Sequence, residues 1–393
     1  MFNALFNSNQ ILGRSRNPWM DYAKGICILM PVYRHTFEGL GNVGIGSYSY
    51  NGIRMIDVFT MGFRMPVFFM IAGAFFASSI ARKGVGGFMN GRFRTVLYPL
   101  MIWGGIQITL QMLFAGAGVN AQRTPLDYLN LILDPRKLEQ FWYLNALFFV
   151  STIYALLHYY AKFKIQHQLG LALVFYVISS YCERNHIYIG FLSGVTFYYI
   201  FFCIGDALHK VVLDEKNHEW LSSFRTSAIL VPVFVAIELY CTSLNLAHPE
   251  ESDFYVQYYR QEVFLVSAVI GAAFMIHLAF LLQRFNSMRW LRVVGYHAIY
   301  IYLSHMLVTA GMRILLVNIM GITNIPLLIC IIYPLGIILP MIGFNIARRL
   351  GATWIFTLRE DSPAPKPKPA TANTMYFTRE AVVPRESGSN TPS

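Results

Sequence analysis

The sequence predicts an all-α polytopic membrane protein, a bundle of about ten transmembrane helices with both termini in the cytoplasm. Hydrophobic residues make up 55% of the 393-residue chain and charged residues only 13%, whereas soluble domains average about 25% charged residues. The apolar residues recur in blocks of about 20, which is the length of helix that crosses the hydrocarbon core of a bilayer. The excess of Lys and Arg falls into the loops on one side of these blocks.

Ten apolar blocks are candidates for membrane spans. In chain order they cover residues 18–38, 53–80, 95–117, 141–160, 168–183, 189–208, 226–246, 261–283, 293–317 and 325–347. The tenth block contains Pro326, Pro334 and Pro340, which membrane helices tolerate where neighbouring groups satisfy the freed backbone. We therefore expect a membrane domain over 18–350.

The two ends of the chain differ from this domain. Residues 359–393 are rich in Pro, Ser, Thr and Lys, with little apolar surface to bury, and predict a disordered cytoplasmic tail. Residues 1–17 form a cytoplasmic segment without the pattern of a cleaved signal peptide, so the first helix is expected to be a retained signal-anchor.

The basic residues set the predicted orientation, because cytoplasmic loops of membrane proteins carry the excess of Lys and Arg. With the N-terminus inside, the outer loops hold only Arg123, Arg136, Lys137, Arg184 and Arg260. The inner side holds Arg14, Arg16, Arg82, Lys83, Arg92, Arg94, Lys162, Lys164, Lys210, Lys216, Arg225, Arg284, Arg289, Arg292, Arg348, Arg349 and Arg359.

The net charge of +11 is thus mostly topological, and it does not indicate nucleic-acid binding, which needs a basic cluster in one domain. The five cysteines fall in or beside the apolar blocks, and no pair has metal-binding or redox spacing. No metal site is expected.

The first block carries two ionisable residues, Lys24 and His35, in WMDYAKGICILMPVYRH. Eleven residues are about three helical turns, so both side chains lie on one face, about 16 Å apart along the axis. Asn17 and Pro18 predict the helix start as cap and first-turn residue. Ionisable residues inside membrane segments are costly and usually functional, but Lys24 could also be an interfacial anchor.

Glu38 follows His35 by three residues and shares its helix face. A carboxylate there can bond one ring nitrogen and make the other a better base, which is the minimal general-base unit. Two interpretations stay open on spacing alone: a catalytic His35–Glu38 pair, or a structural histidine beside a loop carboxylate. Asp57 and Arg64 form a second polar set, which could pair internally or with Lys24.

At these residues the sequence resembles integral-membrane acyltransferase family 3, whose mostly bacterial members O-acylate polysaccharides and glucans. The family's first helix carries a basic residue, ten residues and then histidine, which Lys24 and His35 match. Further landmarks follow in family order as FRMPVFFMIAGAFF, GRFRTVLYP, FWYLNALFF and GYHAIYIYLSH. Glucan succinyl- or acetyltransferases look most similar. The sequence departs from the family pattern at Lys24, Arg64, Thr95, Asn145 and His297.

The resemblance implies transfer of an acetyl or succinyl group from cytoplasmic acyl-CoA to a hydroxyl of an extracytoplasmic glycan, at a bacterial inner membrane. It favours His35 as the general base, with Glu38 as its carboxylate partner. His305, one turn from Tyr302, is the next candidate: it is either catalytic or part of a structural interhelical hydrogen bond. A covalent acyl-His route is the variant. Lys24 and the Arg92/Arg94 pair, expected on a short inner loop with Arg82 and Lys83, would hold the phosphates of the donor.

Two rival functions remain. Buried charges and proline-interrupted helices also mark transporters, although the sequence shows no inverted repeat. The second rival is a structural membrane subunit without catalytic activity. The many ionisable residues inside the spans argue against it. On the outer side, the loop HPEESDFYVQYYRQE is either an acceptor surface or an interfacial aromatic belt. The sequence does not indicate an oligomeric state.

Overall fold

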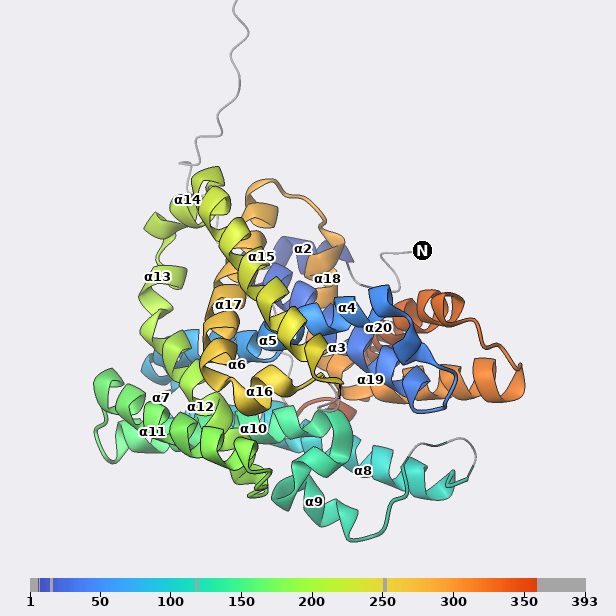
Figure 1. The fold of residues 1–393 in the computed structure, drawn as a ribbon. Helices are drawn as coiled ribbons and strands as arrows, with labels where there is room; N and C mark the ends of the chain where they lie inside the picture. Colours follow the sequence, from blue (N-terminus) through green and yellow to red (C-terminus); the bar gives the residue numbers. More distant parts are fainter. Residues whose placement is uncertain are drawn as a thin grey trace, which may run out of the picture. The chain divides into compact units, whose positions relative to one another are not determined.

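A computed structural model describes residues 6, 8–14, 17–116, 119, 121–249 and 253–358. Every regular element in this part of the chain is a helix (Figure 1). Seven helices there are long and apolar enough to cross a membrane: Asn51–Ala74, Phe76–Leu113, Pro135–Tyr159, Phe224–Ala247, Gln261–Arg284, Ala298–Ile319 and Ile325–Arg349. The all-α polytopic fold is confirmed, whereas ten spans remain a prediction. The predicted tail at 359–393 lies outside the described residues.

The helices divide the predicted blocks more finely than the sequence suggests. The first part of the chain forms α2 (Ser8–Arg14), α3 (Pro18–Gly41), α4 (Asn51–Phe59), α5 (Met61–Arg64), α6 (Pro66–Ala74), α7 (Phe76–Arg92), α8 (Tyr98–Leu113), α9 (Asp127–Leu133) and α10 (Trp142–Tyr159). The rest forms α11 (Ile165–Arg184), α12 (Phe191–Ala207), α13 (His209–Leu213), α14 (His218–Leu221), α15 (Phe224–Ala247), α16 (Tyr255–Tyr259), α17 (Gln261–Arg284), α18 (Trp290–Tyr296), α19 (Ala298–Arg313) and α20 (Ile325–Arg349).

The helix that carries Lys24 and His35, α3, packs against α17, α18, α19 and α20 (Figure 1). It starts at Pro18, as predicted, because proline has the helical φ and lacks an N–H that would need a partner. The side chain of Asn17 makes no cap hydrogen bond, contrary to the expectation. Pro31 is accommodated inside a continuous helix.

Glycines allow two pairs of helices to touch backbone to backbone. On α3 and α18, a Cβ at Gly25 would lie 2.2 Å from the carbonyl oxygen of Leu291, and one at Gly295 would lie 1.8 Å from that of Asp21. A Cβ at Gly73 of α6 would lie 2.0 Å from a carbonyl oxygen of α12. Small residues permit such close approach between membrane helices, and here they bring α3 and α6 into the core of the bundle.

The segment expected as a short inner loop around residues 81–94 is helical instead. Helix α7 continues to Arg92, and a π-helical turn, η2 (Phe93–Leu97), joins it to α8. Only Gly84 interrupts the helical backbone, with φ 65° and ψ 176°, a conformation that glycine adopts easily. The basic residues of this segment are therefore distributed along a helix and not gathered in a loop.

Candidate functional site

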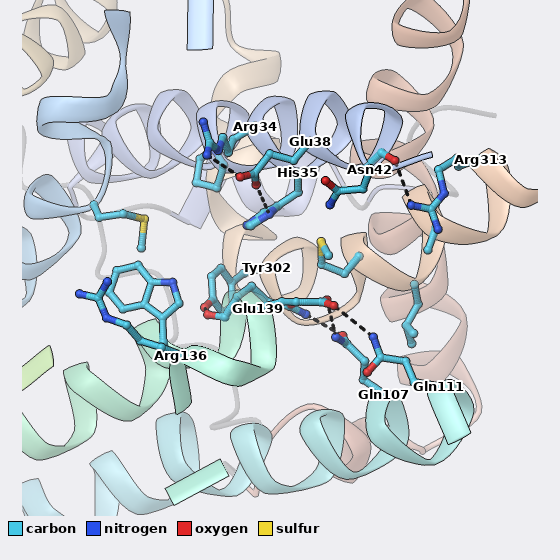
Figure 2. A pocket seen from close by; sticks show the side chains of 18 of the residues that line it. Arg34, His35, Glu38, Asn42, Gln107, Gln111, Arg136, Glu139, Tyr302 and Arg313 are labelled. Atoms are coloured by element: carbon cyan, nitrogen blue, oxygen red, sulfur yellow. Dashed lines mark hydrogen bonds and ion pairs between the residues drawn. The ribbon is translucent and has the colours of Figure 1, made fainter. Parts of the chain in front are cut away.

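A cavity of about 790 Å³ opens beside α3. The wall from α3 consists of residues spaced three or four apart, which share one helix face: Pro31, Arg34, His35, Glu38, Gly39 and Asn42. The other walls come from α5, α8, α19 and η3 (Pro135–Phe141), the segment that leads into α10. In Figure 2, His35 points from α3 towards the side of the cavity where Tyr302 and Glu139 lie. By the predicted orientation, the cavity lies towards the extracytoplasmic side.

His35 and Glu38 both line the cavity, as their spacing predicts. His35 Nδ1 lies 3.6 Å from Glu38 Oε2, and the His35 side chain exposes 20% of its surface. A carboxylate can only accept, so this placement favours the tautomer with the proton on Nδ1 and a lone pair on Nε2. Among the described residues, no hydrogen bond engages Nε2. His35 can therefore act as a base towards a molecule in the cavity.

The carboxylate of Glu38 is held by a buried ionic network. Arg34 donates to Glu38 and to Asp57, and Arg64 Nη1 donates to the other oxygen of Asp57 at 2.7 Å. Asp57 is fully buried. Two guanidinium groups balance two carboxylates, so the network is neutral, which is a requirement for burying charges at acceptable cost.

This network answers one open question and adds a residue that sequence reasoning missed. Asp57 pairs with Arg64, one of the two predicted partners. Arg34 was not predicted to belong to the site. It could have been singled out from the sequence, because it is an arginine inside an apolar block and lies directly before His35.

His305 lies behind His35 and does not line the cavity. The two rings have centroids 5.3 Å apart. His305 is fully buried, and its Nδ1 is 3.0 Å and 2.9 Å from the carbonyl oxygens of Ile301 and Tyr302. Carbonyl oxygens only accept, so Nδ1 carries the proton. The Tyr302 hydroxyl donates to the carbonyl of Gln140 rather than to His305.

The wall opposite α3 is also polar. Glu139 lies across the cavity from His35, and Gln107 and Gln111 of α8 donate to its carboxylate (Figure 2). Arg136 lies on the same side, with its guanidinium 5.6 Å from the centre of the Trp142 ring. Of these residues only Trp142 belongs to a motif noted in the sequence. The segment before it, residues 135–141, has the sequence of an ordinary outer loop.

The three predicted phosphate-binding residues, Lys24, Arg92 and Arg94, are not among those that line the cavity. Arg94 is exposed, and its carbonyl accepts from Thr357 Oγ1 at 3.3 Å. The guanidinium of Arg92 lies 5.0 Å from the centre of the Phe88 ring.

The loop at 248–262 was expected to form an outer acceptor surface or an aromatic belt, but one of its carboxylates points into the protein. Asp253 is buried and forms an ion pair with Arg54. Its neighbour Phe254 lines the cavity and receives the guanidinium of Arg34, 5.2 Å from its ring centre. Glu250 and Glu251 lie outside the described residues.

Within the described residues, no group of three His, Cys, Asp or Glu side chains is placed to hold a metal ion. A histidine beside a carboxylate is a pair that can accept a proton from a molecule in the cavity.

Comparison with known families matches residues 17–344 to acyltransferase family 3, described as an acyltransferase domain. This range includes every cavity residue named above. Comparisons with curated proteins and with solved structures found no match.

Proposed function

Because this chain belongs to acyltransferase family 3, a family of membrane acyltransferases, we propose that it moves an acetyl or succinyl group from cytoplasmic acyl-CoA to a hydroxyl of an extracytoplasmic glycan. The observation that carries the proposal is the His35–Glu38 pair at the wall of a cavity of about 790 Å³. The proposed location is a bacterial inner membrane, with the cavity towards the acceptor side.

In the proposed reaction, His35 Nε2 takes the proton of the acceptor hydroxyl while the oxygen attacks the thioester carbonyl. The new C–O bond forms and the C–S bond breaks. The proton then passes from His35 to the departing sulfur, so the reaction is balanced without another reactant. Glu38 stabilises the intermediate imidazolium, and Arg34 keeps Glu38 in place. General base catalysis of this kind contributes about 10²–10⁴-fold.

A covalent variant uses the same residues in another order. His35 Nε2 attacks the thioester first, so that a C–N bond forms, the C–S bond breaks and the coenzyme A thiolate leaves. The hydroxyl oxygen then attacks the acyl-imidazole, the C–N bond breaks, and the hydroxyl proton passes to the thiolate. The fully buried His305 packs against His35 in both variants.

We propose that the donor approaches the cavity from the side of Arg92. Arg92 ends α7, which packs against α10. The ring of Tyr143 on α10 lies 5.3 Å from that of Tyr302, which lines the cavity. Arginine suits the phosphates of coenzyme A, with Lys24 and Arg94 as further cations on the predicted cytoplasmic side.

The test is a transfer assay with purified protein in liposomes, radiolabelled acyl-CoA and a glucan. We expect label on the glucan from the wild type, and a loss of about 10²–10⁴-fold in His35→Ala. Glu38→Gln should reduce kcat less severely. His167→Ala, a change of an exposed histidine on α11, should retain activity. Full activity of His35→Ala would exclude this mechanism, and glucan counterflow without a covalent product would support a transporter instead.

A further inference from the structure

The second polar wall of the cavity is built around a strained residue. Glu139 has φ 55° and ψ −121°, a backbone conformation that is costly for any residue with a Cβ. Such strain persists only where the surrounding structure enforces it, and it is concentrated at functional sites. Here it occurs at a residue whose carboxylate lines the cavity on the side opposite α3 (Figure 2).

The carboxylate of Glu139 is held by donors from two other segments. Gln107 Nε2 donates to Oε2 at 2.8 Å, Gln111 Nε2 donates to Oε1 at 3.2 Å, and Arg123 Nη2 lies 3.4 Å from Oε1. Gln107 and Gln111 are one turn apart on α8 and present one face. Two carboxylate oxygens offer about four acceptor positions, so the group can accept a further hydrogen bond.

Gln140 supplies an independent observation. Its side chain is 2% exposed and lines the cavity. The Gln140 Nε2 atom donates to Gln107 Oε1 at 2.9 Å. The Oε1 atom of Gln140 itself has no hydrogen-bond partner in the described part of the chain. A buried unsatisfied acceptor is costly, and a donor from a bound ligand would relieve that cost.

We propose that Glu139 and Gln140 form the acceptor-hydroxyl site of the cavity, which binds hydroxyls of the sugar next to the one that reacts at His35. The inference rests on the proposed transfer to a glycan. Both groups are acceptors, so they select ligands rich in O–H donors.

A purely structural role for Glu139, tying η3 to α8, makes a different prediction, and deoxy-sugar acceptors separate the two. The assay measures kcat/KM for methyl glucoside and for its monodeoxy analogues, with saturating acetyl-CoA. In the wild type, at least one deoxy position should lower kcat/KM about 10- to 100-fold, the effect of losing a hydrogen bond to a charged group. In Glu139→Gln that discrimination should shrink to within about threefold.

Gln140→Met, which removes the unpaired oxygen, is the second variant and should reduce discrimination at the same or the adjacent hydroxyl. Glu215→Gln, an exposed glutamate remote from the cavity, is the matched control and should discriminate as the wild type does. Wild-type discrimination in both Glu139→Gln and Gln140→Met would overturn the inference. Absence of transfer by the wild type to glucoside and glucan alike would instead overturn the proposed function.

Discussion

The imidazole rings of His35 and His305 pack against each other, with centroids 5.3 Å apart and planes inclined at 39°. His305 is anchored by hydrogen bonds from Nδ1 to carbonyl oxygens of its own helix, whereas His35 is partly exposed to the cavity. His305 therefore limits where the His35 ring can lie, and we assign it as a positioning residue behind the base.

Replacing His305 should affect the placement of His35 more than the chemistry. We expect His305→Ala to lower kcat about 100-fold, since a misplacement of about 1 Å can cost that much. His305→Phe, which keeps a ring in the same space, should retain activity within about tenfold of the wild type. The acyl-CoA KM should change little in either variant. Equal, severe losses in both would indicate that a ring nitrogen of His305 takes part in proton transfer.

The neutral network around Asp57 should be essential for stability. Asp57→Asn leaves the guanidinium groups of Arg34 and Arg64 with one carboxylate between them, and breaking a buried ion pair in this way costs about 3–5 kcal/mol. We expect a clear drop in the thermal unfolding temperature in detergent. Adding Arg64→Gln restores the charge balance and should recover part of the loss. An unchanged unfolding temperature in Asp57→Asn would contradict this role.

The backbone contact between α3 and α18 should not tolerate a methyl group. In Gly295→Ala the Cβ would lie 1.8 Å from the carbonyl oxygen of Asp21, so the helices must separate, at a cost of about 1–3 kcal/mol for an overpacked contact. Gly343→Ala is the control, because a Cβ at Gly343 of α20 meets nothing within 4 Å. Thermal unfolding of the two variants should differ, with only Gly295→Ala destabilised.

The donor route predicts different effects for two nearby arginines. Arg92 ends α7, which packs against α10, and Arg92→Ala should raise the KM for acyl-CoA. Arg94 is exposed, so Arg94→Ala should raise it less. Initial rates at varied acyl-CoA and fixed glucan measure both. A larger effect at Arg94 would move the donor route to the outer surface of η2.

Local features of the site could be read from the sequence. The three-residue spacing of His35 and Glu38 places both on one helix face, and the structure confirms that they meet at one cavity. The apolar blocks predicted helices correctly, because hydrophobic length is a local property. The sequence did not predict that the block 53–80 is divided into separate helices at Thr60, Met65 and Phe75. It also did not predict that residues 82–94 are helical.

The sequence by itself determined an all-helical membrane protein and the helix that carries His35 and Glu38. Only the tertiary structure decided what surrounds this pair: Arg34 bonded to Asp57, His305 behind His35, and Glu139 across the cavity. Asp57, Glu139 and His305 are far from His35 in the chain, and residues of this kind are brought together by helix crossings such as that of Gly25 and Gly295. Hydrophobic periodicity specifies which residues are buried, but the pairing of helices depends on side-chain shape and charge in three dimensions.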